Sequence, residues 1–114
     1  MNTLEDVQRI VIDFYYGTGK KMELVTDPSK VIEGAREAEF QFTEGLIQLE
    51  RLKLSPADRR HFKLLRGAFY DVIRSMREVR KGNVAKASKY GSQSADKAFR
   101  YVLAVGIKVG EPNE

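Results

Sequence analysis

The chain has 114 residues, of which 42% are hydrophobic and 32% are charged, with a net charge of +4. This size and composition predict one folded helical domain over residues 1–114 and exclude a disordered chain. The absence of cysteine excludes disulfides and thiolate metal sites. No apolar run is long enough to cross a membrane, and the N-terminus lacks a signal-peptide pattern. We therefore expect a cytoplasmic protein with no membrane partner.

The N-terminal segment combines helix and strand signals. A capping box is indicated at Thr3–Asp6, and apolar residues follow at helical spacing: Leu4, Val7, Val11 and Phe14. Residues 10–16 are nevertheless rich in β-branched and aromatic side chains, and Gly17 and Gly19 come next. We favour a helix that breaks near Gly17. A strand that turns at the glycines toward residues 22–25 is the alternative.

Two long helices are predicted in the middle of the chain. The first, over about 29–53, starts after Asp27-Pro28-Ser29 and has the apolar face Val31, Ala35, Ala38, Phe42, Gly45, Leu49 and Leu52. Ser55-Pro56-Ala57-Asp58 has the pattern of a helix N-terminus. The second helix is therefore expected to begin there and to bury Phe62, Leu65, Phe69, Val72, Met76 and Val79.

A third long helix is predicted over about 84–105, after the stop and cap signals of Gly82-Asn83. Its core face consists mostly of small residues, which should allow the preceding helix to approach closely: Val84, Ala87, Gly91, Ser94, Ala98, Tyr101 and Val105. Because only Leu54-Ser55 separates the first two long helices, we expect antiparallel neighbours. The predicted fold is an all-α, up-and-down antiparallel helical bundle of three long helices plus the N-terminal helix, with residues 106–114 as a frayed tail.

Charge is unevenly distributed along the chain. Residues 1–50 contain ten acidic and five basic residues, whereas residues 51–110 contain fifteen basic and four acidic residues. The excess recurs on two predicted helix faces, which we call the basic stripes: Arg59, Lys63, Arg66, Tyr70, Arg74, Arg77 and Lys81 on one, and Lys86, Lys89, Lys97 and Arg100 on the other. Few acids stand one turn away from these cations, so we expect the positive charge to be largely uncompensated.

Basic stripes with interleaved tyrosine are typical of proteins that hold phosphates and stack bases. We therefore expect a non-enzymatic module that contacts the backbone of DNA or RNA, within a nucleoprotein complex as a small subunit. An acidic protein partner, or a solvated face that only aids solubility, are the alternatives. No pattern for sequence-specific reading is present.

A second surface favours a protein partner. Glu37, Phe40, Glu44 and Ile47 occupy the side of the first long helix opposite its core residues. Phe40 and Ile47 either pack against the N-terminal segment or form the centre of an acidic-rimmed interface with another protein or a second copy. The chain would then be an adaptor or dimerisation module.

Residues for catalysis or cofactor binding are scarce. The lone His61 has Asp58 nearby but no further metal ligands, and we expect no catalytic residue, no metal and no cofactor. Gly17-Thr-Gly-Lys20-Lys21 is similar to a phosphate-binding loop. It departs from that pattern at Phe14, where glycine is needed, and at Lys21, where Ser or Thr is needed.

Overall fold

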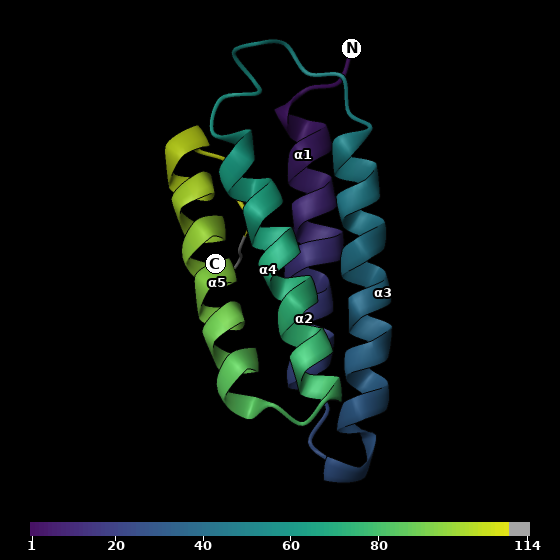
Figure 1. Cartoon of the computed structure of the whole chain (residues 1–114). Coiled ribbons are helices and arrows are strands. Elements are labelled where there is room, and N and C mark those ends of the chain that lie inside the picture. The colour runs from purple at the N-terminus through teal and green to yellow at the C-terminus, as the bar shows by residue number, and fades with distance from the viewer. Residues whose placement is uncertain (110–114) are drawn as a thin grey trace.

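The structure, a computed structural model, describes residues 1–109, and over this range it is all-helical with no strand. Four helices pack against one another (Figure 1). The N-terminal helix lies against α3 (Val31–Glu50), α3 lies against α4 (Phe62–Arg80), and α4 lies against α5 (Val84–Val105). The predicted all-α class is confirmed.

The N-terminal segment is helical from end to end, so the strand alternative is wrong. It comprises α1 (Leu4–Ile10), the π-helical turn η1 (Val11–Tyr16) and α2 (Gly17–Glu23). The predicted capping box is present: the Thr3 hydroxyl accepts from the backbone of Glu5, and the Asp6 carboxylate accepts from the Thr3 amide. Gly17 does not break the helix. Its amide donates to the Ile12 carbonyl and closes the wider π-turn.

The absence of a side chain at Gly45 allows the close contact between the N-terminal helix and α3. The 3₁₀ turn η2 (Pro28–Lys30), capped by Asp27, leads into α3. On α3, a Cβ built at Gly45 would lie 2.4 Å from the Cβ of Phe14 and 3.0 Å from the ring of Phe69. Only glycine allows this approach. The predicted core face of α3 is largely buried, at Ala35, Ala38, Phe42, Gly45 and Leu49.

The connection between α3 and α4 differs from the prediction. The Ser55 hydroxyl does accept from the Asp58 amide at 3.2 Å, as a cap would, but the following residues form successive turns and α4 starts only at Phe62. His61, immediately before it, adopts a left-handed conformation with φ 64°. None of residues 55–61 is buried, so no apolar contact holds a helical turn against the bundle there. Phe62 is the first side chain to enter the core.

The α4–α5 pair is joined by hydroxyl–carbonyl hydrogen bonds between the helices. Ser94 of α5 donates to the Ala68 carbonyl of α4 at 2.6 Å, and Ser75 of α4 donates to the Ala87 carbonyl of α5 at 2.7 Å. Both serines are buried. These bonds require closely spaced backbones, which the small residues provide. The predicted range of this helix, its Asn83 cap and its close packing are confirmed. Val84, expected on the core face, is 78% exposed, because it is the first residue of the helix and lies beyond the contact with α4 that starts at Ala87.

Tyr15 links the N-terminal helix to this pair. Its hydroxyl lies 2.6 Å from the Ser94 hydroxyl, and its ring packs against Phe42 and Phe69, with centroid distances of 6.1 and 5.5 Å. Because Ser94 donates to Ala68, Tyr15 is the donor to Ser94. Burial raises the pKa of Tyr15 to about 12.

The chain turns back after α5. Gly106 adopts a left-handed conformation that ends the helix. Ile107 and Val109 are half-buried against the core, and the Gln8 amide donates to the Lys108 carbonyl. The rest of the predicted frayed tail, residues 110–114, lies outside the described residues. Of the helices described, none has the length and apolar character needed to cross a membrane.

Gly45→Ala should destabilise the fold, because its methyl group would overlap Phe14. Overpacking of this kind costs about 1–3 kcal/mol. Gly19→Ala is the matched control: it lies within α2, and nothing lies within 4 Å of its built Cβ. It should stabilise the fold by about 0.5–1 kcal/mol through helix propensity. Urea unfolding followed by circular dichroism measures both, and a Gly45→Ala protein as stable as wild type would contradict the close contact.

Tyr15 should make the fold sensitive to alkali. Its folded-state pKa lies above the unfolded value of about 10, so its contribution is complete below pH 10 and is lost as pH rises toward 12. From the size of the shift this loss amounts to about 1–3 kcal/mol. Tyr15→Phe should lose correspondingly less stability between pH 9 and pH 11.5. Urea unfolding at the two pH values measures the difference, and equal losses in both proteins would contradict it.

Candidate nucleic-acid interface

A hollow of about 450 Å³ lies on the surface where α4 and α5 meet. It is lined by Lys63, Leu64, Arg66, Gly67, Tyr70 and Lys97. Four of these six residues belong to the predicted basic stripes, and they come from both helices. The structure thus places three cations and one tyrosine around a single concave surface, which we call the basic hollow.

Gly67 determines the shape of the basic hollow. A Cβ at this position would lie 3.1 Å from Lys97 Cδ, so the absence of a side chain allows Lys97 to lie across α4. The Lys97 ammonium then reaches the carboxylate of Asp71 at 2.6 Å. Asp71 is 4% exposed, and it needs this partner because an unpaired buried carboxylate is costly. Lys97 is therefore a fixed wall of the basic hollow.

The other walls are more accessible. Tyr70 is 43% exposed, and Lys63 is exposed and makes no ion pair with any residue from 1 to 109. Arg66 pairs with Glu50 of α3 at 3.2 Å, and both side chains are partly exposed to water. Exposed pairs of this kind contribute about 0–1 kcal/mol, so a phosphate can compete for Arg66. Lys63 and Arg66 can hold phosphate, and the face of Tyr70 can stack on a base or ribose.

The expectation that the stripes are largely uncompensated is wrong. Ion pairs are made by six of the ten predicted cations: Arg66, Arg74, Arg77, Lys81, Lys97 and Arg100. Two of the acids, Glu39 and Glu50, come from α3, which packs beside α4. Glu39 is shared, at 2.8 Å from both Arg77 and Arg80. The other four cations pair with acids of the basic half itself, Asp71, Glu78 and Asp96. Together, these local acids and the acids of α3 neutralise much of the predicted positive surface.

The remaining predicted residues lie around the basic hollow or away from it. Arg59 precedes α4 and stacks on Phe62, with its guanidinium 5.0 Å from the ring centroid. Arg74 lies one turn beyond Tyr70 and faces the ring of Tyr90 at 5.9 Å. Lys86 and Lys89, near the start of α5, are exposed and have no ion-pair partner in the described range.

Sequence reasoning missed Gly67 and the α3 acids. Gly67 and Asp71 lie one helical turn apart on α4. This spacing is a signal that a long cationic side chain of a neighbouring helix could cross the glycine and reach the carboxylate. No sequence signal identifies Glu39 and Glu50 as partners of α4, because their pairing depends on which side of α3 faces that helix.

The outer face of α3 is exposed. Phe40 is 66% exposed, Ile32 49% and Ile47 39%, so the N-terminal segment does not bury Phe40 or Ile47. Glu37 and Glu44 flank them and form no ion pair with any described residue. We call this surface, comprising Ile32, Glu37, Phe40, Glu44 and Ile47, the α3 face. Its large apolar side chains leave much of their surface exposed to water.

Two other sites considered from the sequence are a metal site at His61 and a phosphate-binding loop at Gly17–Lys21. Over residues 1–109, no group of three or more acidic or histidine side chains could hold a metal ion, and His61 lies exposed in the turn before α4. Gly17–Lys21 lies within helix α2 and therefore does not form a phosphate-binding loop.

Comparison with known proteins does not assign this chain to a family. No protein-family model, curated protein or solved structure matches this chain.

Proposed function

We propose that this protein is a non-enzymatic nucleic-acid-binding module that holds a single strand of DNA or RNA at the basic hollow. The observation that carries the proposal is the convergence of Lys63, Arg66, Tyr70 and Lys97 from two helices on one concave surface. Its volume of about 450 Å³ suits a nucleobase with its ribose. Tyr70 supplies the stacking surface, and Lys63 and Arg66 supply the phosphate contacts.

The internal ion pairs limit the extent of this interface. With Arg77 and Lys81 engaged by acids, the strand is held by about two or three phosphates at the basic hollow rather than by a stripe of six to eight. Such binding is weak for an isolated module, which fits a small subunit of a larger nucleoprotein complex. The proposal includes an up-and-down antiparallel arrangement of the helices and a cytoplasmic location.

Lys63→Glu should weaken binding of a labelled, mixed-sequence 20-nucleotide single strand by tenfold or more, because it removes a phosphate contact and adds repulsion. Lys30→Glu is the matched control: it makes the same charge change at an exposed lysine of η2, outside the basic hollow. It should change the affinity less than twofold. Fluorescence anisotropy at 50 mM salt measures both, and equal losses in the two variants would refute a local site.

The same assay distinguishes the basic hollow from a continuous stripe. Tyr70→Ala should lose about 1–3 kcal/mol of binding free energy through lost stacking. The logarithm of the affinity should fall with the logarithm of salt concentration with a slope of about −2, as three phosphate contacts on a single strand predict. A slope near −5 would instead indicate that the whole stripe binds.

A second candidate function, a protein adaptor or dimerisation module, is favoured by the exposure of the α3 face. Phe40→Glu should convert a larger species into a 13.0 kDa monomer by light scattering, since a carboxylate would be buried at the centre of the contact. Phe99→Glu makes the same change at a 60% exposed site on α5 and should leave the larger species intact. A wild-type protein that is already monomeric would contradict self-association through this face.

A further inference from the structure

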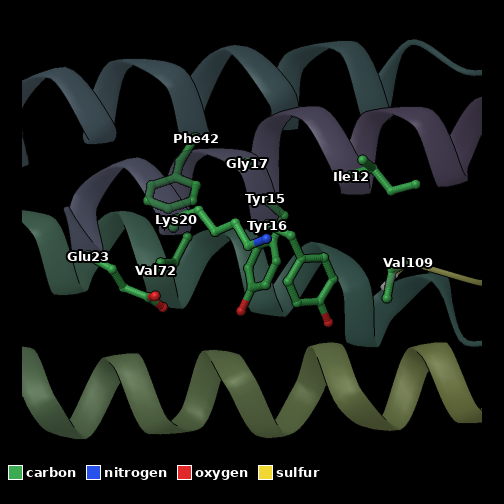
Figure 2. Close-up of a pocket in the computed structure, with 10 residues that line it drawn as sticks. Ile12, Tyr15, Tyr16, Gly17, Lys20, Glu23, Phe42, Val72 and Val109 are labelled. Atoms are coloured by element: carbon green, nitrogen blue, oxygen red, sulfur yellow. The ribbon is translucent and has the colours of Figure 1, made fainter. Parts of the chain in front are cut away.

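A cavity larger than the basic hollow lies away from it. It has a volume of about 560 Å³ and is bounded by the N-terminal helix, α3, α4 and the segment after α5. We call it the tyrosine cavity. Its apolar walls come from Ile12, Tyr15, Tyr16, Phe42, Val72 and Val109 (Figure 2). This volume is typical of sites that enclose a small organic ligand.

The walls of the tyrosine cavity favour an aromatic ring. Tyr15 and Tyr16 meet edge to face, with centroids 5.0 Å apart and planes at 85°, and Phe42 lies beyond Tyr15. Aromatic rings pack favourably in such offset and edge-to-face arrangements. Both tyrosines stand in the π-helical turn η1, and π-turns recur at functional sites.

The mouth of the tyrosine cavity carries a cation. Lys20 extends toward the tyrosine rings in Figure 2, and among residues 1–109 no acid forms an ion pair with it. Glu23, one turn further along α2, lies on the same rim and is also without an ion pair within that range. Gly17 and Gly19 leave this part of the rim without side chains, and open space surrounds a Cβ built at Gly19.

The hydroxyl groups of Tyr15 and Tyr16 have different roles. Tyr15 is occupied by its bond to Ser94 and therefore acts as a fixed wall. Tyr16 lines the cavity, and its hydroxyl has no hydrogen-bond partner within residues 1–109, so it is free to donate to a ligand. Burial raises the pKa of Tyr16, so it remains a donor at neutral pH.

We infer that the tyrosine cavity is a binding site for a small aromatic carboxylate. The ring would lie among Tyr15, Tyr16 and Phe42, and the carboxylate would pair with Lys20 and accept from Tyr16. Glu23 limits the ligand to a single negative charge. The inference is independent of the proposed function, because it uses none of the residues of the basic hollow.

The test uses three ligands of one shape: 2-naphthoate, neutral 2-naphthol and the cation 2-naphthylmethylammonium. Isothermal titration with the 114-residue chain should show 2-naphthoate binding best, with one site per chain, and the cation worst. In ¹H–¹⁵N spectra, the largest shifts on adding 2-naphthoate should occur at the amides of Ile12, Gly17, Gly19 and Val72. Absence of 2-naphthoate binding below 1 mM, or shifts confined to the α3 face, would overturn the inference.

Lys20→Glu should weaken 2-naphthoate binding at least tenfold and reverse the preference between anion and cation. Lys21→Glu makes the same charge change at the next residue, which does not line the cavity, and should bind as wild type does. Gly19→Leu should also weaken binding at least tenfold by filling the mouth while preserving the helix. Equal binding by the Lys20 and Lys21 variants would overturn the role of Lys20, and undiminished binding by Gly19→Leu would overturn the site.

These variants also separate the inference from the proposed function. Lys20→Glu should bind the labelled single strand as wild type does, and Lys63→Glu should bind 2-naphthoate as wild type does. Loss of both activities in Lys20→Glu would mean that the cavity is part of the nucleic-acid site, and would overturn an independent ligand site.

Discussion

The arrangement of this protein depends on a short chain of buried hydrogen bonds. Tyr15 donates to Ser94, and Ser94 donates to the Ala68 carbonyl, so one relay joins the N-terminal helix, α5 and α4. In a low-dielectric interior a buried hydroxyl without a partner costs about 1–3 kcal/mol, so these hydrogen bonds favour this register of the three helices over others. The same register places Gly67, the residue before Ala68, next to Lys97 of α5. The Lys97 side chain can therefore cross α4 at this glycine.

Charge on this molecule has to be understood through packing. The acidic half of the chain supplies α3, and α3 lies beside the basic α4, so Glu39 and Glu50 neutralise arginines that sequence spacing presents as free. The pairs differ in strength. Arg66 and Glu50 are both partly exposed to water and can exchange partners, whereas Lys97 is held by the nearly buried Asp71. A long basic stripe is thereby reduced to a local site.

The two hollows share a chemical principle on different parts of the surface. In each, a tyrosine ring stands beside a lysine: Tyr70 with Lys63 in the basic hollow, and Tyr16 with Lys20 in the tyrosine cavity. Both arrangements suit an aromatic ring that carries negative charge, but they differ in the segments that line them. The basic hollow opens along two helices and can follow a strand, whereas the tyrosine cavity is bounded by four segments and suits a compact ligand.

The sequence by itself determined most of the helices, because helical periodicity and caps are local: the Thr3 capping box, the Asn83 cap and most of each apolar face appear as predicted. It also identified most residues of the basic hollow. Only the tertiary structure decided where α4 begins, since residues 55–61 have cap chemistry but nothing to pack against. Packing also decided that Arg66, Arg77 and Lys97 are neutralised and that Tyr16 and Lys20 border a cavity, because these features depend on contacts between segments far apart in the chain.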